Sequence, residues 1–190
     1  TTPPIETPIL SSPIEVDFFN SHSIGGDIAA HKTYSQADFK FFGTPTQGVD
    51  PHTYSFSGKA TITPEVTGKH ELRLVQSGKT RIRINNEIII DATEGDFGKG
   101  DDFFGMGSAE ITAEIHLEAG SEIPIEIEFS SEGAILMLGC RIGLKPIMER
   151  DLLQEAQDLA AKSDAALVIV GTNDDWETEG RDRDSFFLPG

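Results

Sequence analysis

KHELRLVQSGKTRIRINNEIIID, residues 69–91, is the stretch that decides the fold class of this chain. Leu72 and Leu74, and then Ile82 and Ile84, alternate with charged residues, a period of two that is typical of strands with one buried face. Between the second and third apolar runs stands Asn85-Asn86, and asparagine tolerates the positive φ of a tight hairpin turn. The stretch therefore predicts strands at 69–75, 79–84 and 87–91, the last two forming a hairpin.

The same alternation continues on both sides of this stretch. Further strands are predicted at 14–18, 53–63, 111–117, 123–129 and 136–144. Pro124 has no N–H to donate, so its strand should lie at a sheet edge or begin there. Residues 20–50 predict loops, with one candidate strand at 38–42. So many short strands with glycine-rich turns predict a mostly β protein, a two-sheet β-sandwich or a barrel over residues 13–145, and the two-sheet β-sandwich is our prediction.

The two ends of the chain differ from this middle part. Residues 1–12 are rich in proline, threonine and serine, which predicts an extended linker rather than a packed element. Residues 146–190 begin with a helical spacing of apolar residues after Pro146, followed by the continuous apolar run Ala165–Val170. A helix followed by a buried strand is one unit of an α/β sandwich, so 146–190 should be part of a second domain.

Composition excludes several function classes. The formal net charge is −17 and the pI is near 4.5, so nucleic acid and anionic membrane surfaces would be repelled. No run approaches the roughly 18 apolar residues of a membrane helix, and no secretory signal is recognisable at the start. The compartment cannot be read from the sequence. The single cysteine, Cys140, lies in an alternating strand, which predicts a core position and no zinc site.

The closing loop concentrates charge after the apolar run. It holds the only tryptophan, Trp176, with two arginines and six acidic residues: Asp174, Asp175, Glu177, Glu179, Asp182 and Asp184. Carboxylates with an aromatic ring beyond the carboxyl end of a strand suggest sugar chemistry. The plain alternative is a solvated surface loop.

These residues carry a resemblance to a known family. Glu179-Gly180-Arg181-Asp182-Arg183, preceded by Trp176-Glu177-Thr178 and followed by Leu188-Pro189-Gly190, resembles the fungal type of glycoside hydrolase family 3 β-glucosidases. Residues 13–145 are similar to the protective-antigen-like β-domain that some of these enzymes carry as an insert. That second resemblance rests on Ser55–Gly58, Thr61–Pro64, Gly68–Val75 and the hairpin Arg81–Asp91.

The resemblance implies a role for each candidate residue. Glu179 would be the general acid/base of a retaining β-glucosidase, with Glu177 as its rival because a two-residue alignment slip exchanges them. Trp176 would either stack on a sugar or pack the base of the loop. The family's nucleophile is an aspartate in a Ser-Asp-Trp triplet of a preceding barrel domain, and this triplet is absent here. The expected partners are a β-glucoside or cello-oligosaccharide substrate and the enzyme's remaining barrel and α/β domains.

No cofactor or metal is expected. Lectin-like relatives use two adjacent aspartates for calcium-dependent sugar binding, whereas Gln76-Ser77-Gly78 stands at that place.

The loop Ala92–Ser108 is the second candidate site. It sets Phe103 and Phe104 among glycines and aspartates, Asp102 included, and loops of this length tend to be functional. By the family resemblance, such a loop reaches over the catalytic pocket and favours short substrates, so we predict that Phe103, Phe104 and Asp102 contact substrate. Alternatively, the two rings fill the end of the sandwich.

Two other functions remain open at this point. One is a stand-alone carbohydrate-binding module, which would bind glycan through residues 13–145 alone. The other is a structural insert that mediates contacts in a homo-oligomer.

Overall fold

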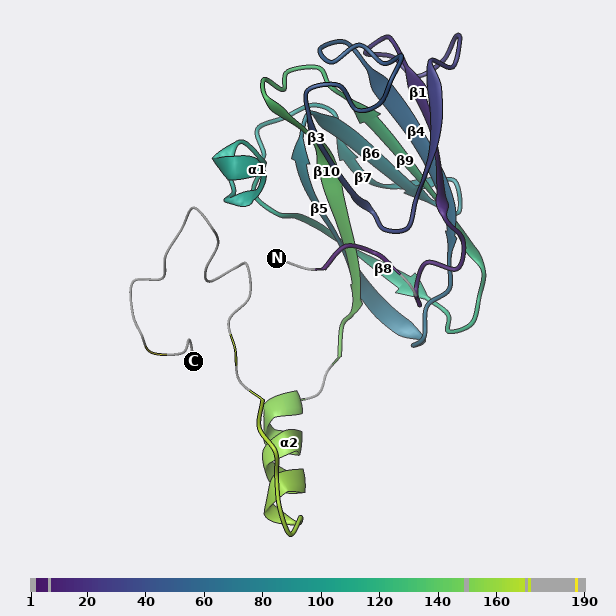
Figure 1. Ribbon diagram of the computed structural model, residues 1–190. Helices are drawn as coiled ribbons and strands as arrows, with labels where there is room; N and C mark the ends of the chain where they lie inside the picture. The colour runs from purple at the N-terminus through teal and green to yellow at the C-terminus, as the bar shows by residue number, and fades with distance from the viewer. Residues whose placement is uncertain (1–2, 7, 149–150, 170, 172–186, 188–190) are drawn as a thin grey trace. The chain divides into compact units, whose positions relative to one another are not determined.

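The computed structural model describes residues 3–6, 8–148, 151–169, 171 and 187, and the chain divides into two compact units after Ile147. The first unit holds ten strands in the described residues, arranged as two antiparallel sheets (Figure 1). The strands are β1 (Ile14–Phe19), β2 (Ala30–Tyr34), β3 (Asp38–Phe42), β4 (Ser55–Ile62), β5 (Gly68–Ser77), β6 (Lys79–Ile84), β7 (Glu87–Ala92), β8 (Ile111–Leu117), β9 (Ile123–Ser130) and β10 (Met137–Pro146).

The strand order brings distant parts of the sequence together. One sheet has six strands in the order β2-β1-β4-β9-β6-β7, and the other has four in the order β3-β10-β5-β8. The predicted two-sheet β-sandwich is confirmed.

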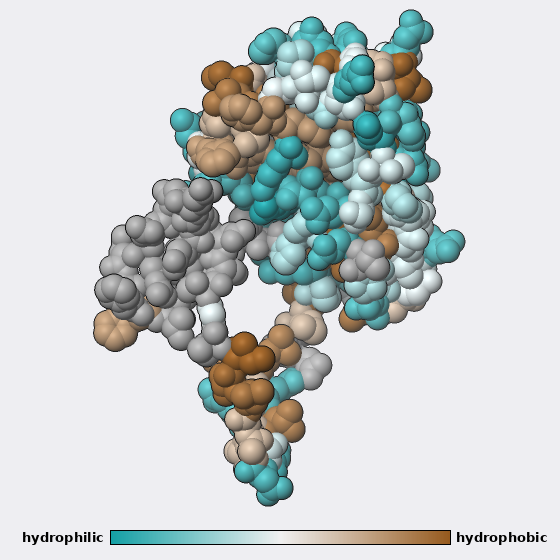
Figure 2. Space-filling model, in the orientation of Figure 1, coloured by the Kyte–Doolittle hydropathy of each residue, from teal (hydrophilic) through white to brown (hydrophobic). Residues whose placement is uncertain are grey.

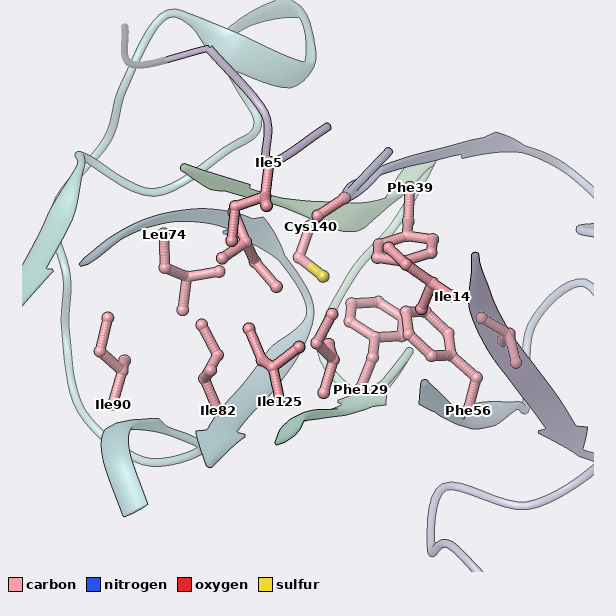
Figure 3. Packing of buried hydrophobic residues seen from close by; sticks show 14 of the residues in the cluster. Ile5, Ile14, Phe39, Phe56, Leu74, Ile82, Ile90, Ile125, Phe129 and Cys140 are labelled. Carbon is pink, nitrogen blue, oxygen red and sulfur yellow. The ribbon is translucent and has the colours of Figure 1, made fainter. Parts of the chain in front are cut away.

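The core lies between the two sheets because most apolar residues of the alternating pattern face inward. Phe39 of the four-stranded sheet meets Phe56 of the other at 5.0 Å between ring centroids, and Phe56 stacks on Phe129 at the same distance (Figure 3). Aliphatic residues continue the layer away from these rings. Cys140 lies among them as the sequence predicted, and burial raises the pKa of its thiol to about 12.

The hairpin of β6 and β7 forms as predicted. Asn85 and Asn86 have φ angles of 52° and 65°, the left-handed values that a two-residue turn needs. Pro124 is the second residue of β9, a central strand rather than an edge strand. The strand begins one residue before this proline, so the missing donor falls at the strand end, where it disturbs the ladder least.

One strand was missed, and the predicted linker was wrong. β2 carries exposed polar residues and pairs only with β1, so no alternation reveals it. At the start of the chain, Ile5 and Leu10 are buried at 2% and 6% exposure. The Ile5 N–H donates to Ile142 O at 2.9 Å, and Ile5 O accepts from the Ala37 N–H. Proline prevents regular structure here, but it does not prevent the apolar residues between the prolines from packing.

The second unit contains one helix in its described residues, α2 (Leu152–Ala161). Asp151 caps it, its carboxylate accepting from the Gln154 N–H at 2.9 Å. The predicted helix is therefore present, but it begins after Asp151 and not at Pro146, which ends β10. The strand predicted over Ala165–Val170 does not form in residues 165–169. A parallel strand needs neighbouring strands to pair with, and the described part of this unit supplies none.

Candidate functional site

The loop between β7 and β8 is anchored at both ends by one residue, Gln76 of β5. Its backbone N–H donates to Ser108 Oγ at 3.1 Å, and its carbonyl accepts from the Ser108 N–H at 2.8 Å. The side-chain amide of Gln76 donates to Ala92 O at 2.8 Å. These bonds hold the two ends of the loop together, so its middle projects as a compact turn.

That turn is α1 (Asp102–Gly105), and its backbone is left-handed. Phe103 and Phe104 both have φ of 56°, and Gly105 has φ of 75°. For bulky residues this conformation costs about 1–2 kcal/mol each, because Cβ crowds the next carbonyl oxygen. Two consecutive residues held in such a conformation mark a site that the surrounding structure must enforce.

The left-handed turn sends the two rings in different directions. Phe103 is 3% exposed and Phe104 is 85% exposed. The Phe103 ring lies beneath Lys40, whose Nζ is 5.7 Å from the ring centroid. It also lies against Gly107, where an added Cβ would be only 3.0 Å from Phe103 Cδ2. Phe103 thus anchors the turn, and of these two rings only that of Phe104 is exposed.

Asp102 also faces the protein. Its carboxylate lies 3.5 Å from Arg141 Nη1 of β10, and Arg141 Nη2 lies 3.4 Å from Asp38 of β3. Lys40 completes the group, with Nζ 3.7 Å from Asp38. We call these four side chains the charge quartet. Of the three residues predicted to contact substrate in this loop, the structure places two, Phe103 and Asp102, in the supporting layer.

A pocket of about 510 Å³ opens beside α1. Its walls come from residues 92–99, 105–108 and 132–135, and its floor is Gln76–Lys79. The pocket combines apolar side chains such as Phe97 and Met106 with polar ones, a mixture typical of sites for small polar ligands. Gln76 Oε1 is buried there without a protein partner. Lys79 bonds to Glu132 and Glu94, and these carboxylates raise the pKa of the lysine.

An exposed apolar patch surrounds Phe104. Figure 2 shows it as a brown area over α1 and the connection between β9 and β10. The exposed apolar residues of these two segments are Phe104, Met106, Ile135 and Leu136, and the exposed Phe42 of β3 pairs in register with Met137, which follows the connection. Patches of this kind on a soluble protein mark contact sites for ligands or other protein surfaces. This end of the sandwich, with its pocket and its exposed apolar residues, is therefore the candidate functional end.

The catalytic candidates of the closing loop, Glu179 and Glu177, lie outside the described residues, as does Trp176, so their roles stay predictions. Within the described residues, no three His, Cys, Asp or Glu side chains are arranged to hold a metal ion. Neither helix there is long and apolar enough to cross a membrane. Sequence reasoning missed the charge quartet and Gln76, because charged residues in alternating strands are read as the solvent face. The one signal in the sequence was that the charged residues Asp38, Lys40 and Arg141 stand among apolar residues of two predicted strands, which could have indicated a buried ion pair.

The fold and the projecting loop define a class of protein. The PA14 domain model matches residues 14–147, and the chain belongs to the PA14 domain family. This confirms the protective-antigen-like domain expected from the sequence.

Relatives place this domain in a particular kind of protein. The chain is 27% identical over 186 residues to a β-glucosidase of Rhizobium radiobacter, covering 96% of this chain and 23% of that protein. It is 34% identical over 144 residues to β-glucosidase B of Emericella nidulans, covering 71% and 17%. The crystal structure of a selenomethionine-labelled β-glucosidase from Kluyveromyces marxianus aligns with a TM-score of 0.81 at 24% identity, covering 100% of this chain and 24% of that one. The chain thus spans less than a quarter of each relative, and the resemblance to β-glucosidases is confirmed.

Proposed function

We propose that this chain is the PA14 insert and part of the following α/β domain, residues 146–190, of a retaining β-glucosidase that acts on short β-glucosides. The observation that carries the proposal is the extent of the similarity to the Rhizobium radiobacter enzyme. It covers 96% of the chain and therefore continues beyond residues 14–147, which the PA14 domain occupies. A PA14 domain alone is compatible with many functions, whereas this continuous similarity favours one kind of enzyme.

In this proposal the closing loop supplies half of the catalytic pair. A retaining glycosidase needs a nucleophilic carboxylate and a protonated carboxyl group about 5–5.5 Å apart. Glu179 is the proton donor to the departing oxygen, and it then takes a proton from the water that releases glucose. The nucleophile belongs to a barrel domain outside these residues.

The sandwich supplies the wall of the substrate entrance. Phe104 is a rigid, exposed ring on a braced turn, and aromatic rings stack on the apolar faces of sugars. In this proposal the ring contacts the leaving-group part of a bound substrate and limits the length of substrate that fits. The enzyme thus prefers cellobiose and aryl glucosides to long chains.

The test of the catalytic assignment compares Glu179→Gln with Glu177→Gln in the full-length enzyme. Loss of the acid/base slows release of poor leaving groups most, since good ones depart without a proton. We expect Glu179→Gln to form the glucosyl-enzyme from dinitrophenyl glucoside at a near-normal rate but to lose turnover of methylphenyl glucoside. Added azide should restore turnover of the dinitrophenyl substrate, because azide attacks the glucosyl-enzyme without a general base, and the product should be a glucosyl azide. If Glu177→Gln shows this pattern and Glu179→Gln does not, the roles switch.

A second candidate function rests on the pocket beside α1. Its mixed lining and the unpaired Gln76 Oε1 favour a carbohydrate-binding module that needs no catalysis. Calorimetric titration of this chain with glucose and cellobiose, with and without a chelator, separates the two functions. Binding by the chain alone, abolished by Gln76→Leu, would favour the module, whereas no binding leaves the enzyme fragment as the better account.

A further inference from the structure

The left-handed turn of α1 needs a physical explanation. Its own hydrogen bonds are few: the amides of Gly105, Met106 and Gly107 donate to Asp101, Phe103 and Asp102 carbonyls, each at 3.1 Å. Burial of Phe103 supplies part of the compensation. The backbone of Phe104 is strained in the same way, yet its ring gains nothing from burial. Some other interaction must hold this residue in place.

The charge quartet is one interaction that joins α1 to the strands of the sandwich. Asp38 and Arg141 are direct partners in the register of β3 and β10, so Arg141 stands on a rigid part of the sheet. Its guanidinium pairs with Asp38 on the neighbouring strand β3 and with Asp102, the first residue of α1. The four side chains carry two positive and two negative charges. The group is therefore neutral, and each carboxylate has a cation beside it.

The polar atoms of the quartet have little access to other hydrogen-bond partners. Asp38 Oδ1, Asp102 Oδ2 and Arg141 Nε are buried and have no hydrogen-bond partner in the protein, so the ion pairs made by the other atoms of these groups are their main compensation. The side chains of Asp102 and Arg141 are only 17% and 19% exposed, so water screens the pair incompletely. Removing one charge here leaves its neighbour partly buried and uncompensated, which costs more than the loss of an exposed ion pair.

We propose that Arg141 is a positioning residue: through Asp102 it holds α1 in the left-handed conformation and thereby fixes the direction in which Phe104 projects. Asp38 and Lys40 keep the guanidinium in place and the group neutral. The consequence for substrate length rests on the proposed function, whereas the effect on the turn itself does not. In this proposal the direction of the Phe104 ring, which contacts substrate, is set by Arg141 on strand β10, and Arg141 itself contacts no sugar.

Hydrogen exchange of this chain tests the positioning directly. The variants are Asp102→Asn, Arg141→Met and the conservative Arg141→Lys, and the readout is exchange of the Gly105, Met106 and Gly107 amides. The matched control is Lys145→Met, because Lys145 also lies on β10 and pairs across strands with Glu71 at 3.4 Å, but touches no part of α1. Amides of Leu74 and Ile142 report the stability of the sandwich.

The expected result is local. Asp102→Asn and Arg141→Met should speed exchange of the three α1 amides about tenfold, while Leu74 and Ile142 stay unchanged. Arg141→Lys keeps the charge but loses the guanidinium that reaches two carboxylates, so its α1 amides should exchange at a rate between those of the parent and Arg141→Met. Lys145→Met should have no effect on α1. Unchanged α1 amides in Asp102→Asn would overturn the proposal, even if Arg141→Met failed to fold. An equal acceleration of α1 and core amides would also overturn it, since that is the sign of a purely structural role.

Activity of the full-length enzyme then separates the two levels of inference. If Phe104→Ala alters the preference for substrate length and Asp102→Asn alters it in the same direction, both stand. If Phe104→Ala alters it and Asp102→Asn does not, the positioning role is wrong. If Phe104→Ala has no effect while the α1 amides respond as expected, the proposed role of Phe104 fails and the positioning of the turn remains.

Discussion

Two adjacent phenylalanines show how much one backbone angle decides at the scale of a residue. The sequence pairs Phe103 with Phe104 in an irregular loop, where no period tells which ring is buried. The structure separates them through left-handed φ values at both positions, so one ring anchors the turn and the other is exposed. Sequence reasoning found the loop and its aromatic residues. It did not find the division of roles, because left-handed backbone at phenylalanine has no sequence signal.

The strain at Phe104 gives a prediction of stability. Glycine adopts φ of 56° without a Cβ clash, whereas alanine does not. We expect Phe104→Gly to be more stable than Phe104→Ala by about 0.5–1 kcal/mol, although glycine loses more chain entropy on folding. Urea denaturation of this chain measures the difference. Equal or reversed midpoints would show that the turn is not strained at this position.

At the scale of elements, the sequence predicted nine of the strands but, apart from the hairpin of β6 and β7, not which of them pair. The first sheet joins β1 to β4 and β4 to β9, contacts between residues far apart in the sequence. An alternating pattern shows which face of a strand is buried, but it does not show which strands pair with it. β2 was missed for the related reason that an edge strand with polar residues has no apolar face.

The edge strand β2 gives a prediction of pH dependence. His31 of β2 lies 2.7 Å from Asp17 and 2.8 Å from Glu15, both on β1. These hydrogen bonds, Asp17 first, raise the pKa of His31 above 6.5 in the folded state. The bridge therefore adds its full stability below pH 6.5, and that stability is lost as the pH rises through the higher folded pKa.

Thermal unfolding between pH 5.5 and 8.5 and an NMR titration of the ring measure this effect. We expect the melting temperature of the parent to fall across that window by more than that of His31→Gln. An imidazole that titrates at or below 6.5, or parallel pH profiles for the two proteins, would contradict the bridge.

At the scale of the whole molecule, the residues that pack into the sandwich begin earlier in the chain than the change in amino-acid composition indicates. The first residues have the composition of a linker, yet Ile5 is hydrogen-bonded between Ile142 and Ala37 and belongs to the core of the sandwich. Local composition reports backbone preference, whereas burial depends on a surface built from residues far along the chain. Sequence therefore placed the core of the domain correctly but did not show that Ile5 and Leu10, from the residues expected as a linker, pack into it.

Substitution of Ile5 tests this start of the domain. Ile5→Ala should lower the free energy of unfolding by about 2–4 kcal/mol, since it leaves a cavity in the core. Ile28→Ala is the matched control, because Ile28 is exposed, and it should change stability by less than about 0.5 kcal/mol. Chemical denaturation compares the two variants. If both variants lost similarly little stability, Ile5 would not belong to the core, and residues 1–12 would be a linker as the sequence predicted.

The claim that a PA14 domain sets the substrate entrance of a β-glucosidase is tested most directly by one ratio. It is kcat/KM for cellotetraose divided by kcat/KM for cellobiose, measured in the full-length enzyme with Phe104→Ala and with Ile88→Ala, an exposed residue of β7, as control. Loss of the ring should raise the ratio about threefold to tenfold, equivalent to about 0.7–1.4 kcal/mol of differential transition-state binding. Ile88→Ala should leave it unchanged. A ratio for Phe104→Ala that equals the parent's would contradict the account.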